Sequence, residues 1–204
     1  MLTAAALVLC YILGSIPFGL IIGKLAKGID IRDFGSGNIG ASNVLRTLGP
    51  GPAAAVFLFD TAKGTAAVLL CKALGLPAYL VVAGGLLSLI GHTASVFLRF
   101  KGGKGVATSL GIIIGLNGII AAIAFGIWLV TVSVTRFISV ASIVASLSVP
   151  LMMLLWKDPR VPIPYQVLAW VAAAAIAARH QSNIKRLLAG TEPRIFQKTK
   201  GESR

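Results

Sequence analysis

Residues 100–108, FKGGKGVAT, bring three glycines and two lysines together. Glycine lets backbone N–H groups come close to an anion, because it has no Cβ. Lysine adds positive charge, and a helix starting directly after the segment would add the positive end of its dipole. The segment therefore predicts a phosphate-binding loop that is shaped by Gly102, Gly103 and Gly105 and charged by Lys104. It lacks the GxxxxGK[ST] spacing of a nucleotide-binding P-loop, so we reject a nucleoside triphosphatase.

A second donor-rich segment, GSGNIGASNVLR, covers residues 35–46. It places three glycines, two serines and two asparagines before Arg46. Backbone N–H groups, hydroxyls, amides and a guanidinium are thus expected within one loop, and a nest of this kind suits phosphate oxygens. The alternative is an ordinary Gly/Ser/Asn turn. Such a turn does not need so many donors or an arginine at its end.

The third polar segment, RHQSNIKR, covers residues 179–186. On a helix His180 and Asn183 would share one face, because they are three residues apart. Lys185 and Arg186 have a simpler explanation, as a basic helix end that anchors to lipid headgroups. Histidine and asparagine are poor anchors, so we expect those two at the site.

Asp60, Lys63 and His92 each have two interpretations. Asp60 and Lys63 are three residues apart in an apolar segment, where charges are costly and usually paired. A structural ion pair is favoured, and a pair that positions the site is the alternative. His92 is either a structural hydrogen-bonding residue or part of the substrate site.

Several familiar catalytic patterns are missing from the sequence. It contains no HxxxxD pair, GxSxG elbow, Cys/His couple or carboxylate pair. The six acidic residues leave little for a metal site. We therefore expect chemistry that uses cationic and neutral donors, without a metal or cofactor.

The composition is that of an integral membrane protein. Hydrophobic residues make up 56% of the 204, the mean hydropathy is +0.89, and only 12% of residues are charged, against about a quarter in soluble domains. The net charge of +13 fits cytoplasmic loops and an anionic substrate. A nucleic-acid binder would need a solvated domain with base-stacking aromatic residues, and none is visible. Cys10 and Cys71 lie in apolar runs and are expected to be small core residues.

The hydropathy pattern predicts an all-α bundle of seven transmembrane helices. As one helix, the uncharged segment 105–135 would be about 46 Å long, well over a ~30 Å hydrocarbon core, so we expect a hairpin with its turn at Asn117 and Gly118. The expected spans are residues 2–23, 51–71, 77–98, 105–117, 118–135, 137–156 and 164–178.

The positive-inside rule gives this bundle an orientation. All three polar segments and most Lys and Arg residues then lie on one face, whereas Lys72, Lys157 and Arg160 lie on the other. We therefore expect the N-terminus outside and the C-terminus cytoplasmic, with a short basic tail at 186–204.

The three segments, in this order, resemble the bacterial membrane family of acyl-phosphate:glycerol-3-phosphate acyltransferases over nearly the whole chain. The matching stretches are GSGNIGASNVLR, GHTASVFLRFKGGKGVAT at 91–108 and RHQSNIKRLLAGTEPR at 179–194. The sequence departs from the family pattern at Ser95, usually Pro, and at Ser42, more usually Thr. The resemblance implies one membrane acyltransferase domain, residues 1–204, in the bacterial inner membrane with a cytoplasmic active site.

The implied reaction moves a fatty acyl group from acyl phosphate, not acyl-CoA, to the 1-hydroxyl of sn-glycerol 3-phosphate. The products are lysophosphatidic acid and phosphate, the first step of phospholipid synthesis. The base is either the acyl phosphate itself or His180. The residues expected to hold glycerol 3-phosphate and act in catalysis are Ser36, Arg46, Lys104, His180 and Asn183. Those expected to bind substrate otherwise are Gly37, Asn38, Gly40, Ala41, Asn43, His92, Gly102, Gly103 and Gly105.

A transporter of organic phosphates is the alternative function. Transporters usually have inverted repeats and a site near the bilayer midplane, whereas here no repeat is visible and the polar segments lie at one surface. The expected partners are the two substrates and membrane lipids, with no nucleic acid and no obligatory protein partner.

Overall fold

The computed structural model describes residues 1–156 and 161–195, and all regular structure within those ranges is helical. Two 3₁₀ turns, η1 (Ile31–Asp33) and η2 (Val96–Leu98), interrupt the loops. The α-helices are α1 (Leu2–Ser15), α2 (Phe18–Lys27), α3 (Ala41–Leu48), α4 (Pro50–Ala73), α5 (Ala78–Thr93), α6 (Val106–Leu116), α7 (Gly118–Thr135), α8 (Ile138–Trp156), α9 (Ile163–Arg179) and α10 (Gln181–Leu188).

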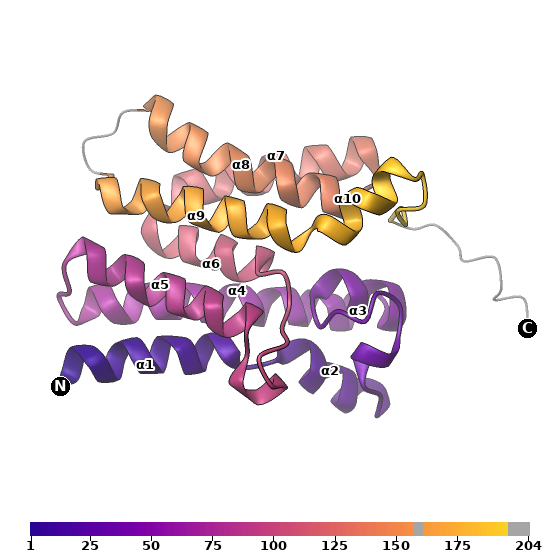
Figure 1. Cartoon of the computed structure of the whole chain (residues 1–204), viewed down its shortest axis with the longest axis horizontal. Helices are drawn as coiled ribbons and strands as arrows, with labels where there is room; N and C mark the ends of the chain where they lie inside the picture. The colour runs from indigo at the N-terminus through magenta and orange to yellow at the C-terminus, as the bar shows by residue number, and fades with distance from the viewer. Residues whose placement is uncertain (157–160, 196–204) are drawn as a thin grey trace, which may run out of the picture.

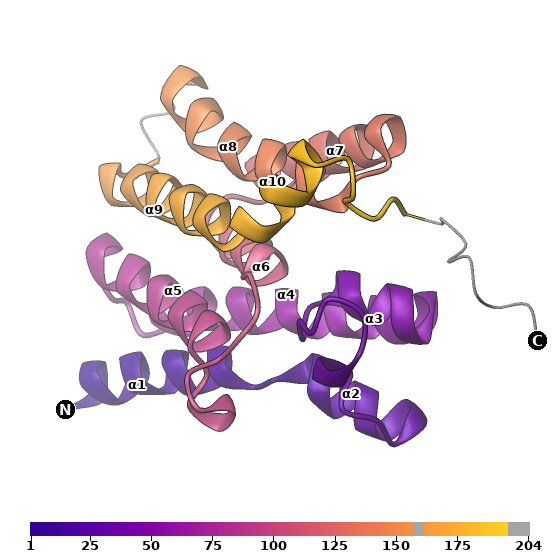
Figure 2. The same cartoon turned by 45° about the vertical axis from the view of Figure 1, so that its right-hand side comes forward.

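The long helices lie side by side in a bundle, with α1 and α2 at one edge and α7 and α8 at the other (Figures 1 and 2). Helix α4 packs against α6, α1 against α5, and α8 against both α7 and α9. The N-terminus and the α4–α5 turn lie at one end of the bundle, and the short helices α3 and α10 lie at the opposite end (Figure 1). The first and third polar segments are therefore at the same end.

Within residues 1–156 and 161–195, five helical segments are long and apolar enough to cross a membrane. They are Leu2–Lys27, Pro50–Ala73, Ala78–Leu98, Gly118–Thr135 and Ile138–Trp156. Helices α6 and α9 are shorter, with 11 and 17 residues. At 1.5 Å per residue α6 is only about 16 Å long, roughly half a hydrocarbon core. If α6 completes a crossing, the loop before it enters the membrane, which is tolerated where protein buries that loop or where it lines a cavity.

The expected break at Asn117 is confirmed. Helix α6 ends at Leu116 and α7 begins at Gly118. The side-chain oxygen of Asn117 accepts the N–H groups of Ile119 and Ile120, both at 3.1 Å. This is an N-cap, which stabilises the start of α7 by satisfying donors that have no partner within the helix.

The expected span 2–23 lies within the candidate span Leu2–Lys27. Its helix is interrupted between α1 and α2, because Pro17 has no N–H with which to continue the hydrogen-bond ladder. One expectation about local structure is wrong: segment 35–46 is not one loop, because it becomes helical at Ala41, where α3 begins. Cys10 and Cys71 pack in the core as expected, as free cysteines whose sulfur atoms are 3.8 Å apart and share an S–H···S hydrogen bond.

Candidate functional site

A pocket of about 390 Å³ opens among α3, α4, α6, α7, α8 and α9. One part of its wall is polar and comes from all three polar segments, although these are far apart in the sequence. Gly37, Gly102 and Gly103 belong to the same loops but do not line the pocket. The expected site residues that do line it are Ser36, Asn38, Gly40, Ala41, Asn43, Arg46, His92, Lys104, Gly105, His180 and Asn183.

The amide of Asn43 organises the first loop. This side chain is buried, and its oxygen accepts the N–H of Ser36 at 2.8 Å. Its nitrogen donates to the carbonyl oxygens of Ile31 and Phe34 at 3.1 and 3.0 Å. The hydroxyl of Ser36 then accepts a hydrogen bond from the Arg46 guanidinium at 3.3 Å. Asn43 thus holds the loop in the shape that brings Ser36 to Arg46.

Two backbone donors that we expected to face a phosphate are used inside the first loop. The N–H of Gly37 donates to the carbonyl of Phe34 at 3.0 Å, and the N–H of Gly40 donates to the Asn38 side chain at 2.9 Å. The first turn of α3 lines the pocket instead, through Ala41 and Ser42. The positive end of this helix is therefore available to an anion.

Residues 102–105, which we call the glycine loop, end at Gly105, which is the N-cap of α6. The φ of Gly105 is 84°, in the left-handed region that favours glycine. Val106 and Ala107 of the first α6 turn line the pocket, as expected for a helix that offers N–H groups to an anion. The third polar segment meets this loop directly. Arg179 donates to the carbonyl oxygens of residues 102 and 103 at 3.0 and 3.1 Å, and the Lys104 ammonium donates to the side-chain oxygen of Asn183.

Glu192 lines the pocket and was not predicted from the sequence. It is buried, and one of its oxygens accepts hydrogen bonds from Asn183 at 2.6 Å and Ser139 at 2.7 Å. The other oxygen accepts from Arg186 at 2.8 Å. A signal was present, because this is an isolated carboxylate in a strongly basic stretch. It orients Asn183, which in turn contacts Lys104.

The charges around Lys104 change its acidity. Burial, opposed by Glu192 and reinforced by Arg186 and Arg46, lowers the pKa of Lys104 from 10.5 to about 8. For Glu192, burial would raise the pKa, but hydrogen bonds from Asn183 and Ser139 outweigh it and hold the pKa below its ordinary value. The site thus holds an ionised carboxylate among several cations and has room for further negative charge.

His180 is neutral at physiological pH. Burial, with Lys104 nearby, lowers the pKa of this imidazole to about 4. Its Nδ1 lies 2.7 Å from the carbonyl oxygen of Ile176. A carbonyl can only accept, so Nδ1 carries the proton and Nε2 has the free lone pair. His180 therefore suits the role of hydrogen-bond acceptor for a hydroxyl, and it is a weaker base than an ordinary histidine.

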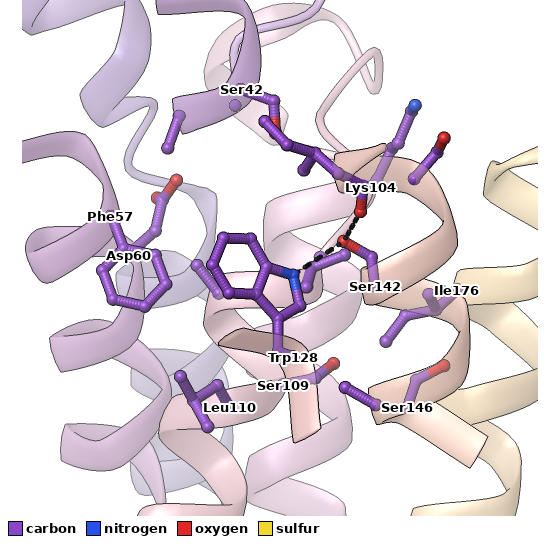
Figure 3. A pocket seen from close by; sticks show the side chains of 18 of the residues that line it. Ser42, Phe57, Asp60, Lys104, Ser109, Leu110, Trp128, Ser142, Ser146 and Ile176 are labelled. Carbon is purple, nitrogen blue, oxygen red and sulfur yellow. Dashed lines mark hydrogen bonds between the residues drawn. The ribbon is translucent and has the colours of Figure 1, made fainter. Parts of the chain in front are cut away.

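The rest of the pocket is apolar and aromatic. Trp128 lies across its middle, between Phe57 and Ser142 (Figure 3). The rings of Phe57, Phe125 and Trp128 stack in sequence, with centroids 5.9 and 6.0 Å apart. The indole N–H donates to Ser142 at 3.3 Å, so this large side chain is held in place. The pocket can thus take an anionic head at one end and an apolar tail at the other.

The expected pairing of Asp60 with Lys63 is confirmed, at 2.8 Å with both side chains buried. The described ranges contain no group of three His, Cys, Asp or Glu residues that could hold a metal ion.

Comparison with known proteins identifies the family. A family model described as glycerol-3-phosphate acyltransferase matches residues 4–190. Two similar proteins carry that name. One, from Synechococcus sp. (strain JA-3-3Ab), is 50% identical over 188 residues, which cover 92% of this chain and 91% of the relative. The other, from Gloeobacter violaceus (strain ATCC 29082 / PCC 7421), is 47% identical over 189 residues, which cover 91% of each.

Two crystal structures of PlsY (YgiH), described as an integral membrane glycerol 3-phosphate acyltransferase, are also similar. The glycerol 3-phosphate form has a TM-score of 0.89 and 40% identity, covering 95% of this chain and 96% of the other. The lysophosphatidic acid form has a TM-score of 0.87 and 39% identity, covering 95% of each. The chain, a multi-pass membrane protein, therefore belongs to the glycerol-3-phosphate acyltransferase family.

Proposed function

We propose that this protein transfers a fatty acyl group from acyl phosphate to the 1-hydroxyl of sn-glycerol 3-phosphate, giving lysophosphatidic acid and inorganic phosphate. The observation that carries the proposal is the joining of a cationic, donor-rich wall to an apolar aromatic cavity within one pocket. Both substrates are anionic at one end, and one has a long apolar tail. The family membership and the glycerol 3-phosphate and lysophosphatidic acid forms of the similar PlsY structures support the same reaction.

In this proposal glycerol 3-phosphate binds where the three polar segments meet. Arg46, Lys104 and the hydroxyl of Ser36 hold its phosphate, and Asn183 and His180 contact its hydroxyl groups. The acyl phosphate group lies against the part of the first loop that lines the pocket, at Asn38, Gly40 and Ala41, while Asn43 holds the loop in shape. The first turns of α3 and α6 supply backbone donors, and Gly102, Gly103 and Gly105 shape the second loop. The acyl tail extends past Trp128 into the apolar part.

The chemical step is a direct substitution at the acyl carbonyl carbon. The 1-hydroxyl oxygen of glycerol 3-phosphate bonds to that carbon, and the carbon–oxygen bond to the phosphate breaks. The hydroxyl proton passes to a phosphate oxygen of the donor. Because His180 has a pKa of about 4, it serves as the acceptor that orients the hydroxyl and is not the base.

Placement and charge account for the rate in this mechanism. Holding two reactants in a reactive geometry can supply roughly 7–11 kcal/mol of the barrier. Each well-aimed donor to the developing oxyanion contributes about 2.7–4 kcal/mol. Acyl phosphate also has a good leaving group, so neither a protein nucleophile nor a metal is required.

We further propose that the single domain, residues 1–204, crosses the bacterial inner membrane seven times, with its N-terminus outside and its active site cytoplasmic. The basic loops and the pocket's polar wall at one end of the bundle support this orientation under the positive-inside rule. Lys157, Arg160 and the tail beyond residue 195 lie outside the described residues. The orientation is tested by introducing a cysteine near the C-terminus and labelling it from either side of the membrane. A C-terminal cysteine that reacts only from outside contradicts the proposal.

The reaction is tested with purified protein in detergent, synthetic acyl phosphate and glycerol 3-phosphate. We expect lysophosphatidate and inorganic phosphate to appear in equal amounts, without any added protein, metal or cofactor. Acyl-CoA is the matched donor control and should give no product. Efficient use of acyl-CoA would contradict the proposed donor. Uptake of glycerol 3-phosphate into proteoliposomes without acylation would favour a transporter.

A further inference from the structure

The glycine loop lies directly on His92. The N–H of Gly103 donates to the backbone carbonyl of His92 at 3.0 Å. A Cβ added to Gly103 would lie 2.2 Å from Nε2 of the His92 ring, and one added to Gly102 would lie 2.1 Å from the His92 carbonyl oxygen. No side chain fits between the loop and this residue, so the position of His92 fixes how deep the loop sits.

His92 lies beside a buried charged pair. Its Nδ1 is 3.6 Å from the Asp60 carboxylate, in electrostatic contact but beyond hydrogen-bond distance, and Asp60 pairs with Lys63 at 2.8 Å. Lys63 also donates to the carbonyl of Ile16 at 2.9 Å, at the break between α1 and α2. The three charged or polar side chains are only 2–5% exposed. A continuous series of contacts therefore runs from that helix break, through α4 and α5, to the loop that carries Lys104.

This geometry leaves His92 no direct role in the chemistry. Its Nε2 is covered by Gly103, and its Nδ1 is buried beside Asp60 without a hydrogen-bond partner, so neither ring nitrogen is exposed to take a proton from a substrate hydroxyl. The Asp60–Lys63 pair lies within α4, and such a pair alone would not need a histidine between it and the glycine loop. Asp60 and His92 nevertheless both line the pocket.

We propose that Asp60 and His92 are positioning residues, which set the depth of the 102–105 loop and thereby place the Lys104 ammonium against the substrate phosphate. This inference rests on the proposed role of Lys104 in the site. It assigns a functional reason to a buried charged network that would otherwise be costly in a membrane protein.

A double-mutant cycle between His92→Asn and Gly103→Ala tests the contact. Asparagine keeps a polar group where Nδ1 lies and removes Nε2, so it makes room for a methyl group at position 103. We expect kcat/KM for glycerol 3-phosphate to fall about tenfold in H92N and about 100-fold in G103A, because a 1 Å misplacement can cost this much. The double variant should recover at least about tenfold over G103A. Gly126→Ala is the control, because nothing lies within 4 Å of its added Cβ.

Recovery in the double variant, with thermal midpoints matched across the set, supports the proposal, since general structural damage would not be relieved by a second substitution. An activity equal to the product of the two single effects overturns it, as does an H92N variant within twofold of wild type.

Hydrogen exchange of the 101–106 backbone provides a readout that does not depend on acyl transfer. We expect H92N and Asp60→Asn to speed exchange in this segment about tenfold while leaving α7 unchanged, because the loop loses its support. Unchanged exchange overturns the inference even if the enzyme is active. Faster exchange supports it even if acyl phosphate proves to be the wrong donor.

Discussion

The two parts of the pocket are built in opposite ways. The polar part depends on individual contacts: Lys104 reaches Asn183, Asn183 reaches Glu192, and Arg46 reaches Ser36. The apolar part is a stack of rings that surrounds a volume, and one hydrogen bond, from Trp128 to Ser142, fixes it. The polar part is therefore expected to recognise a defined charge at a defined point. The apolar part is expected to select the acyl chain by its length and bulk.

This difference predicts different sensitivities to mutation. When one partner is removed, a hydrogen bond or ion pair is lost entirely. A buried polar group that is left without its partner also costs the free energy of its desolvation. Apolar contact is lost in proportion to the area removed, at about 25 cal/mol per Å². Substitutions in the polar part should change how fast the reaction runs, and those in the apolar part should change which acyl chain is preferred.

Lys104→Ala should have the largest effect. We expect kcat/KM to fall at least about 100-fold, because the variant loses the ammonium that holds the phosphate of glycerol 3-phosphate in its reactive position. Lys101→Ala is the matched control, since this exposed lysine lies three residues away in the same segment and does not line the pocket. It should stay within about twofold of wild type. Equal losses in both variants would mean that total charge matters and not the placement of one ammonium.

Glu192→Gln should reduce both stability and activity. The amide cannot accept as strongly from Arg186 or hold Asn183, so we expect about 2 kcal/mol of destabilisation and about a tenfold loss of kcat/KM. Thermal unfolding in detergent and initial rates measure the two. The control is Asp33→Asn, which changes an exposed carboxylate. Normal stability with normal rate would remove Glu192 from the site.

A group in the polar part should also make the rate fall at alkaline pH. Because Lys104 has its pKa lowered to about 8, it loses its charge as the pH rises through that value. We expect kcat/KM to fall by up to about tenfold per unit above pH 8. His180, with a pKa near 4, stays neutral from pH 5 upward and adds no acidic limit there. A Lys104→Arg variant with residual activity should lack the alkaline decline, and a decline that persists unchanged would point to another group.

Trp128→Ala should have the smallest effect on total rate but should change chain-length preference. Removing the indole enlarges the apolar part, so longer acyl phosphates should gain relative to shorter ones by a few-fold, at about 0.8 kcal/mol per additional buried CH₂. Rates with a series of acyl chain lengths measure this. Trp170→Ala is the control, because this tryptophan is 44% exposed and does not line the pocket. An unchanged preference would mean that the tail lies elsewhere.

Local patterns predicted much of the fold correctly. The break at Asn117 was visible because an asparagine followed by glycine stops an uncharged run that is too long for one span. The break at Pro17 and the start of α3 were missed, although proline is a strong signal, because apolar character continues across the first and donor residues across the second.

The residues that line the pocket were predicted better than the contacts between them. Ser36, Arg46, Lys104, His180 and Asn183 do meet in one pocket. The sequence could not show that Gly37 and Gly40 use their N–H groups internally, nor that Asn43 holds the loop, because hydrogen-bond partners depend on the path of the chain. Glu192 was missed for the same reason, since only the fold brings it to Asn183.

The sequence by itself determined that the protein is a helical membrane protein with three donor-rich segments suited to phosphate. Those properties follow from composition and from short-range spacing, which act within a few residues. Only the tertiary structure decided that Glu192 orients Asn183, that Trp128 lies across the apolar cavity and that the glycine loop sits on His92. These contacts join residues up to about 80 positions apart, and their geometry arises from helix packing that no local pattern specifies.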